Sequence, residues 1–135
     1  MIGRRVTLPP DQRLTLLAVF GPEADLVEIY EHSWFARLHA RALATTRKRR
    51  IYLRDSARDF FARPDFVLHE YCHVLKQWEP GHLTVLRYLL EWFRRGYWDN
   101  RFEIEAREFA EDHLHRFRAL LARNRAQLRN DEANA

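Results

Sequence analysis

Two histidines and a glutamate lie close together near the middle of the sequence, in the order His69-Glu70-x-x-His73. On a helix, His69 and His73 project from the same face, one turn apart. Two imidazoles at this separation can share one metal ion, and Zn²⁺ accepts neutral imidazole at about 2.0–2.1 Å and prefers four ligands. Glu70 follows about 100° further around the helix, where it can take a proton from a water molecule that the metal polarises. The pattern predicts a zinc site with Glu70 as its general base.

Apolar residues flank this motif on both sides, with residues 66–68 before it and Val74 and Leu75 after it. A helix that is apolar all round is buried, and polar groups buried without partners are costly. The histidines and the glutamate therefore need either a bound ion or one another as partners. Two readings stay open at this point: a metal site, and a pair of hydrogen-bonded core histidines with Glu70 as their partner.

A catalytic zinc site needs a third protein ligand and one open position. In metzincins the third ligand is a histidine at a fixed spacing after the motif, and a methionine turn follows later in the chain. Glu79 occupies the histidine position here, and Met1 is the only methionine. The sequence therefore excludes the metzincin class.

A better candidate for the third ligand lies in residues 100–110, which we expect to be helical. Zinc peptidases of the gluzincin class commonly supply a glutamate from a later helix. Glu103 shares one helical face with Ala106 and Ala110, whose small side chains would let that helix approach the His69–His73 helix closely. Glu105 points about 200° away from this face. We therefore favour Glu103 over Glu105, while an exposed helix face with ordinary charges remains the alternative.

The rest of the chain supplies the elements that must position these residues. The sequence predicts a helix-dominated α+β fold with a small β-hairpin or sheet and three main helices. The helical spacing of apolar residues and the capping residues predict helices over residues 10–20, 33–41, 65–78 (capped by Asp65), 82–95 and 101–128. Strands are expected over residues 26–30, 42–46 and 50–54, the last two as a hairpin. Residues 55–64 are expected to form a loop, and residues 129–135 a frayed tail.

Two of the predicted helices carry an apolar stripe that we expect to face the core. In residues 10–20 the stripe is Leu14, Leu17, Ala18 and Phe20. In residues 82–95 it is Leu83, Leu86, Leu90 and Phe93. Both sets follow the helical period.

Length and composition favour one domain over residues 1–135, with a core of about residues 10–128, and the His-Glu-x-x-His motif predicts that it is zincin-like. Hydrophobic residues make up 47% of the 135 residues, enough for a core. No apolar run is long enough to span a membrane, and we expect no membrane partner. Cys72 is the only cysteine, so no internal disulfide can form. With no secretory signal evident at Met1, we expect a cytoplasmic protein.

The chain is basic, with a formal net charge of +4. The densest cluster is Arg47-Lys48-Arg49-Arg50, which lies between two strand-like segments and is typical of a hairpin tip. A nucleic-acid-binding domain would use this cluster together with five arginines in and just after the second half of the last helix: Arg116, Arg118, Arg123, Arg125 and Arg129. No zinc-finger spacing or RNA-binding strand motif accompanies them, so a solvated basic surface is the preferred interpretation.

Several segments follow the order found in one known family. These are residues 20–25 (Phe-Gly-Pro-Glu-Ala-Asp), 27–29 (Val-Glu-Ile), 42–46 (Ala-Leu-Ala-Thr-Thr), 51–53 (Ile-Tyr-Leu) and 68–74 with Gln77 close behind. Together they resemble the HExxH metallopeptidase domain known as the core domain of extracellular contractile injection system-associated proteins. Residues 96–106 resemble the Gly-Tyr…Asn-x-x-Glu-x-Glu-Ala segment of related small zincins. The resemblance covers roughly residues 20–110 and implies a zinc-dependent peptidase fold. Arg107 stands where several gluzincins have an aspartate that steadies a zinc histidine, so Asp99 or Glu108 would have to supply that carboxylate.

These observations lead to a functional hypothesis: zinc-assisted hydrolysis of a peptide or protein substrate. His69, His73 and Glu103 are the predicted metal ligands and Glu70 the catalytic base. A further donor should stabilise the oxyanion, and the sequence does not choose among Tyr88, Tyr97 and His82. Tyr71 and Cys72, inside the motif, are expected to be packing residues.

The alternatives are a zincin-like interaction module without catalytic activity and a basic nucleic-acid-binding domain. The sequence does not indicate the oligomeric state.

Overall fold

A four-stranded sheet forms one side of the protein. The computed structural model describes residues 3–37, 44–96 and 100–135. The strands are β1 (Arg4–Val6), β2 (Glu28–Glu31), β3 (Ala44–Arg47) and β4 (Arg50–Leu53), in the order β1-β2-β4-β3. β2 and β4 are parallel, and the other two pairs are antiparallel. The sequence predicted the β3–β4 hairpin and a strand near β2, but it did not predict β1.

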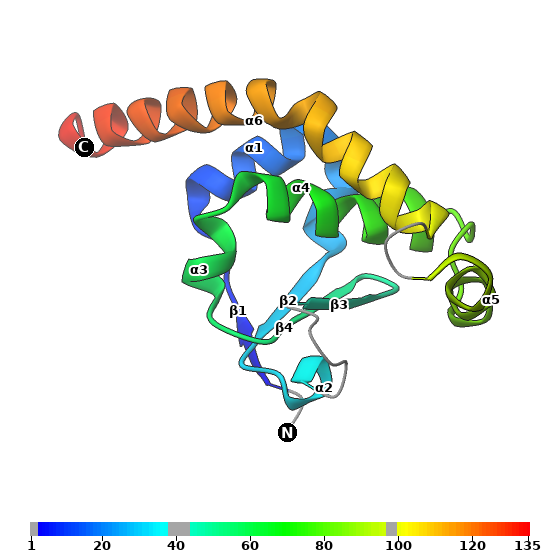
Figure 1. Cartoon of the computed structure of the whole chain (residues 1–135). Coiled ribbons are helices and arrows are strands. Elements are labelled where there is room, and N and C mark those ends of the chain that lie inside the picture. Colours follow the sequence, from blue (N-terminus) through cyan, green and yellow to red (C-terminus); the bar gives the residue numbers. More distant parts are fainter. Residues whose placement is uncertain (1–2, 38–43, 97–99) are drawn as a thin grey trace.

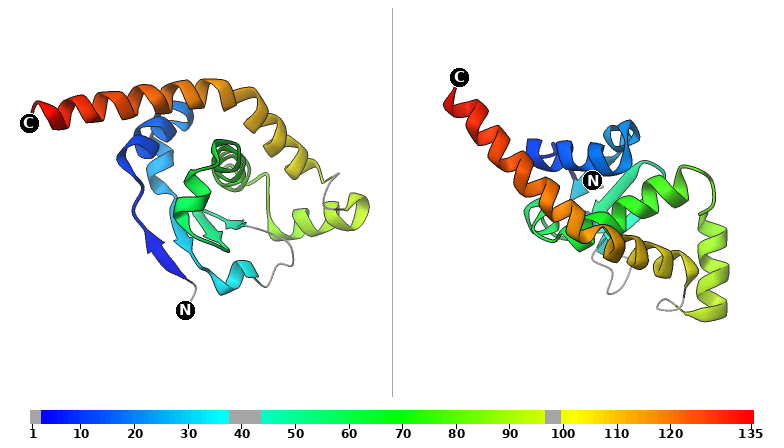
Figure 2. Two further views of the ribbon diagram at one scale, coloured as in Figure 1. Left: turned by 60° about the vertical axis from the view of Figure 1, so that its left-hand side comes forward. Right: turned by 90° about the horizontal axis from the view of Figure 1, so that it is seen from above.

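Helices account for 67% of the structure, so the predicted helix-dominated α+β class is confirmed. Their bounds are α1 (Pro10–Phe20), the 3-10 helix η1 (Pro22–Leu26), α2 (Trp34–Arg37), α3 (Ala57–Phe61), α4 (Pro64–Cys72), the π-helix η2 (His73–Trp78), α5 (Val85–Arg95) and α6 (Arg101–Ala133). Figure 1 shows α4 between the sheet and the long helix α6, with α1 beside them. In Figure 2, α4 is surrounded by the other elements, while α5 and the end of α6 extend outward.

The core forms around α4, because this helix has apolar side chains facing both the sheet and α6. Leu68 and Tyr71 of α4 are fully buried in one cluster with Ile51 of β4 and Phe117 of α6. The predicted packing role of Tyr71 and Cys72 agrees with their burial, since both are at most 1% exposed. The motif-bearing helix is thus the centre of the molecule, as its apolar flanks predicted.

Two helix starts differ from the prediction. α4 begins at Pro64, whose fixed φ suits the first helical position, and its N-cap is Arg63; Asp65 lies inside the first turn and is not the cap. The predicted loop 55–64 contains the short helix α3, whose N-cap Ser56 accepts a hydrogen bond from the Asp59 backbone N–H at 3.1 Å. The Ser-x-x-Asp spacing is a capping signal that the loop prediction overlooked.

The predicted apolar face of α1 is wrong. Its buried residues are Gln12, Thr15, Leu16 and Phe20, whereas Leu14 is 41% exposed. The polar groups of Gln12 and Thr15 are partly paired: the Gln12 amide N–H donates to the Phe61 carbonyl of α3 at 3.3 Å, and the Thr15 hydroxyl donates to the Asp11 carbonyl one turn earlier in α1 at 2.7 Å. The Gln12 side-chain oxygen is buried without a hydrogen-bond partner among the described residues. Such partners come from tertiary structure and local turns, which a count of apolar residues does not reveal.

The basic cluster at residues 47–50 forms the tip of the β3–β4 hairpin, as predicted. Arg49, the second of the two turn residues, has a φ of 61°, a left-handed conformation that a type II turn requires at this position. Its guanidinium pairs with Glu79 at 2.8 Å, just beyond the end of η2, and Arg50 pairs with Glu28 at 3.1 Å. The cluster therefore holds the hairpin against the motif-bearing helix and the neighbouring strand.

The last two helices also correct the sequence-based prediction. α6 continues to Ala133, so the expected frayed tail from residue 129 is helical. The predicted core stripe of α5 is exposed except for Leu83, which precedes the helix: Leu86 is 68% exposed and Phe93 is 80% exposed. Within the described residues, no helix combines the length and hydropathy needed to cross a membrane.

The burial of α6 gives a direct test of this fold. Phe117 is fully buried in the core, and Phe93 on α5 is 80% exposed. We expect Phe117→Ala to lower the free energy of unfolding by about 3–5 kcal/mol, because it leaves a cavity. Phe93→Ala, the matched control, should change it by no more than about 0.5 kcal/mol. Denaturant unfolding measures both, and equal losses in the two variants would contradict this packing.

Candidate metal centre

His69 and His73 lie one helical turn apart where α4 passes into η2. Their Nε2 atoms are 3.2 Å apart, so both rings present the same nitrogen to the same point. The rings are nearly perpendicular, with an interplanar angle of 80°. The expected convergence of the two imidazoles is therefore present in the structure.

Glu103 reaches these histidines from the first turn of α6. Asn100 caps this helix, since its side-chain oxygen accepts the Phe102 backbone N–H at 2.9 Å. Ala106 and Ala110, one and two turns further along, are at most 5% exposed and allow α6 to lie close against α4. The cap fixes where the helix starts and the alanines fix how closely it approaches, and together they place the Glu103 carboxylate beside the histidines.

The three side chains form a compact cluster. Glu103 Oε1 forms a short contact with His73 Nε2 and lies 3.4 Å from His69 Nε2. The possible ligand atoms of His69, His73 and Glu103 all lie within 4.8 Å of one another. Ligand atoms around a tetrahedral Zn²⁺ with bonds of about 2.0–2.1 Å are separated by about 3.3 Å. Two of the three separations match this spacing: 3.2 Å between the two nitrogens and 3.4 Å between His69 Nε2 and the Glu103 oxygen. The His73–Glu103 pair lies closer, as a hydrogen bond does, and would have to widen to hold the ion.

The cluster is closed on the protein side and more open at His69. Glu103 is 3% exposed and His73 is 5% exposed, whereas the His69 side chain is 18% exposed. Within the described residues, no fourth His, Cys, Asp or Glu joins this group. Three ligands with one position left over is the composition of a catalytic zinc site, because structural sites are filled by four protein ligands.

Charge interactions inside the cluster are strong because it is buried. Burial on its own would raise the pKa of Glu103, but hydrogen bonds to His69 and His73 hold it well below its usual range. Burial would lower the pKa of His73, but its hydrogen bond to Glu103 and the charges of Glu103 and Glu70 raise it to about 9. The two carboxylates thus make this pocket of the core attractive to a cation, which a proton on His73 satisfies when no metal is bound.

Glu70 lies beside the cluster and outside the group of possible ligands. It is 9% exposed. Burial raises the pKa of its carboxyl and the Glu103 charge adds to this, while His73 and His69 oppose it. A buried carboxylate with a raised pKa is a better proton acceptor than one in water, which is the property expected of a general base.

Gln77 completes the centre, and the site prediction did not include it. The His73 Nδ1–H donates to the Gln77 side-chain oxygen at 2.6 Å. The Gln77 amide nitrogen donates to the Phe102 carbonyl at 2.9 Å and to Glu105 Oε1 at 3.1 Å. With one proton fixed on Nδ1, His73 directs Nε2 toward Glu103. The second proton of the charged ring sits on Nε2, which donates it to the Glu103 carboxylate, and a metal ion bound there would take its place. Outer partners of this kind fix the tautomer and orientation of metal-binding histidines.

The structure also places the other carboxylates that the sequence offered as a metal ligand or as a hydrogen-bond partner of a ligand. Glu105 points away from the histidines and supports Gln77 instead. Glu108 lies on the exposed face of α6, so it does not replace the aspartate that related motifs have at the position of Arg107. Asp99 lies outside the described residues.

Gln77 lies over His73 because it follows four residues, or about one helical turn, later within η2. η2 closes with an i→i+5 bond from the Glu79 N–H to the Val74 carbonyl at 2.9 Å. Single π turns are frequent at functional sites. A sequence signal for Gln77 existed in its spacing of four from His73.

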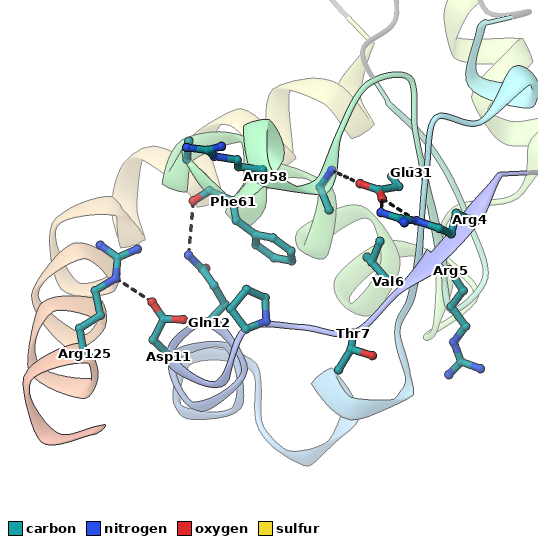
Figure 3. A pocket seen from close by; sticks show the side chains of 13 residues that line it. Arg4, Arg5, Val6, Thr7, Asp11, Gln12, Glu31, Arg58, Phe61 and Arg125 are labelled. Atoms are coloured by element: carbon teal, nitrogen blue, oxygen red, sulfur yellow. Dashed lines mark hydrogen bonds and ion pairs between the residues drawn. The ribbon is translucent and has the colours of Figure 1, made fainter. Parts of the chain in front are cut away.

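A separate cavity of about 800 Å³ lies elsewhere in the protein, between β1, α1, α3 and α6 (Figure 3). Its polar groups are largely paired with one another: Arg125 with Asp11 at 2.6 Å, and Arg4 with Glu31. None of the four residues of the metal centre lines it. The pairing indicates that these charges tie α6 and β1 to their neighbours.

No protein family, curated protein or solved structure matches the chain. The function therefore has to be inferred from the geometry of the site.

The geometry predicts which glutamate holds the metal. Glu103→Gln removes a predicted metal ligand and should weaken zinc binding by more than about 100-fold. This is a larger effect than the loss of a residue that only hydrogen-bonds to a ligand. Glu105→Gln, its neighbour on the same helix, keeps an oxygen for Gln77 and should weaken binding by about tenfold or less. Competition with a chromogenic chelator measures both affinities. Wild-type protein that binds no zinc after reconstitution would rule out the metal centre. A larger loss of zinc affinity in Glu105→Gln than in Glu103→Gln would make Glu105 the metal ligand.

Gln77 gives a second prediction. Gln77→Leu keeps the side-chain volume nearly the same but replaces the polar amide, which removes the acceptor for the His73 Nδ1–H. We expect zinc affinity to fall about 10–100-fold, as for other outer partners of metal-bound histidines. Gln127→Leu, on the exposed part of α6, is the matched control. Equal zinc affinities in the two variants would show that Gln77 does not orient His73.

Proposed function

We propose that the protein is a zinc-dependent peptidase with a zincin-like, gluzincin-type centre. The observation that carries this proposal is the convergence of His69, His73 and Glu103 from α4, η2 and α6 into one buried group. Three nitrogen and oxygen donors with an open position, next to the free carboxylate of Glu70, form the donor set of a hydrolytic zinc site. The proposed substrate is a peptide or protein.

Zn²⁺, when bound there, supplies a Lewis acid that activates water and polarises a carbonyl oxygen. The residues of the chain do the rest. Glu70 takes a proton from the attacking water and delivers it to the leaving nitrogen. Gln77 holds His73 in the tautomer that leaves Nε2 free. The low exposure of Glu70 and Glu103 excludes bulk water, which strengthens the electrostatic interactions inside the site.

Among the residues that the structure describes, Tyr88 of α5 is the best candidate for the oxyanion donor. It is half-buried, and the Asn100 side chain donates to its backbone carbonyl at 3.4 Å, which ties it to the start of α6. Burial raises the pKa of the Tyr88 phenol, and the nearby charges of Glu103 and Glu70 raise it further. The phenol therefore keeps its proton and can donate it in a hydrogen bond. His82 is exposed, and Tyr97 lies outside the described residues.

The composition of the site weighs against the rival functions. A structural zinc would need four protein ligands, and the group within the described residues has three. For nucleic-acid binding, Arg49 and Arg50 of the hairpin tip are already paired with Glu79 and Glu28, which leaves less charge for phosphates. For location we propose the cytoplasm, where a single buried cysteine such as Cys72 stays reduced.

The decisive test replaces the proposed base. Glu70→Gln keeps the shape of the side chain but removes the proton acceptor, so peptide cleavage should fall by at least about 10²–10⁴-fold. Zinc content and melting temperature should stay near those of the wild type. Cleavage is measured on a mass-spectrometric peptide library, with Glu108→Gln on the exposed face of α6 as the matched control.

Two results would count against the proposal. Equal cleavage by Glu70→Gln and wild type would remove Glu70 from the chemistry. Zinc-loaded wild type that cleaves no peptide in the library would leave the zinc as a structural element of an interaction module.

A further inference from the structure

Helix α5 presents its apolar side chains to solvent. The structure describes all residues of Val85–Arg95, and none of them is buried. Six large apolar side chains are between 46% and 80% exposed: Val85, Leu86, Leu89, Leu90, Trp92 and Phe93. Single exposed apolar residues are ordinary, but a contiguous set indicates an interaction surface. We call these six residues the α5 face.

The α5 face points away from the metal centre. Tyr88 and Glu91 are the half-buried residues of the helix, and Asn100 holds the Tyr88 carbonyl against the start of α6. At about 100° per residue, the direction midway between Tyr88 and Glu91 lies roughly opposite the middle of the α5 face. The face is therefore not a wall of the proposed active site, and it needs a different occupant.

The position of α5 makes this face accessible to a large flat object. In Figures 1 and 2 the helix stands at one end of the molecule, beyond the start of α6 and away from the sheet. Thr84 caps it, accepting the Arg87 backbone N–H at 3.1 Å, and Gly96 follows its last residue. The helix is thus a complete, well-terminated unit at the surface.

The charges of α5 identify the chemistry of the occupant. Arg87 and Arg94 follow one edge of the α5 face, and both are exposed. The Arg87 guanidinium donates to the carbonyls of Gly81 and His82 at 3.1 and 3.0 Å, which are neutral groups that leave its charge in place. The one acid of the helix, Glu91, is turned inward. The surface is therefore apolar in the middle and cationic at its edge.

We propose that α5 binds the surface of a membrane that contains anionic lipids. A short amphipathic helix with Trp, Phe and Leu on one face and arginine beside it lies in the plane of the interface, with its apolar side chains among the acyl chains and its cations at the headgroups. The sequence predicted no membrane partner because no segment can span a bilayer. Lying on the surface is a different mode, which an 11-residue helix can adopt.

Charge also disfavours a second copy of the chain as the occupant. If two α5 helices paired antiparallel through this face, the edges that carry Arg87 and Arg94 would meet across the two-fold axis. Like charges brought together in this way repel. An anionic lipid surface instead neutralises every arginine at the edge of the face.

The test measures binding of the full chain to vesicles. Vesicles of equal parts phosphatidylcholine and phosphatidylglycerol should co-sediment the protein, and vesicles of phosphatidylcholine alone should bind it much less. Leu86→Ser with Phe93→Ser should abolish binding. Arg94→Glu should weaken it roughly tenfold, since it reverses one cation near the surface, and added salt should weaken it further.

Matched controls distinguish binding through the α5 face from non-specific hydrophobic binding and from non-specific electrostatic attraction. Leu14→Ser, on the exposed side of α1, and Arg118→Glu, on the exposed side of α6, should bind vesicles as the wild type does. Glu103→Gln should also bind normally, because the surface does not depend on the metal. Circular dichroism confirms that each variant is folded.

Three results would overturn the proposal. The first is no binding to the anionic vesicles by wild-type protein. The second is binding that the Leu86 and Phe93 changes leave intact. The third is a wild-type dimer, seen by light scattering, that these changes dissociate, because the α5 face would then be covered by a second copy.

Discussion

The structure depends on the close contact between α4 and α6, which brings a carboxylate from a distant segment against two histidines. Asn100 sets the start of α6, and Ala106 and Ala110 provide the space for its approach. A bulkier residue at either alanine would move Glu103 away from His69 and His73. The same contact encloses Phe117 and Leu121 in the core, so the packing that stabilises the fold and the packing that assembles the site cannot be separated.

The sequence was sufficient for the parts of this arrangement that helical geometry fixes. His69 and His73 had to share a face because of their spacing, and the alanines behind Glu103 indicated which side of α6 would approach another helix. Glu105 had to point elsewhere for the same reason. The hairpin tip at residues 47–50 followed from two strand-like segments with a polar turn between them. In each case the relevant interaction is local, or it depends on one periodic face.

The predictions failed where tertiary partners override periodicity. The polar residues of α1 are buried because Phe61 and α6 provide partners, as when the Asn124 amide donates to the Thr15 hydroxyl at 3.0 Å. The apolar stripe of α5 satisfied the period of a core helix, but only Tyr88 and Glu91 turn toward the body of the protein. A hydrophobic stripe specifies that a face will be covered without specifying by what. Gln77 was overlooked because its amide is held by the Phe102 carbonyl of α6, which only the tertiary structure places beside it.

The buried cluster is difficult to explain as a device for stability alone. A buried ion pair costs desolvation energy that its attraction often fails to recover, and apolar residues of similar volume frequently stabilise a protein as well or better. Here two carboxylates and two imidazoles lie together in the interior. Burial alone would lower the pKa of His73, but its hydrogen bond to Glu103 and the charges of both carboxylates raise it. The Gln77 side chain orients that ring through a hydrogen bond. A core selected only for folding would have no use for such an arrangement, whereas a divalent cation would compensate both carboxylates and leave Glu70 free to accept a proton.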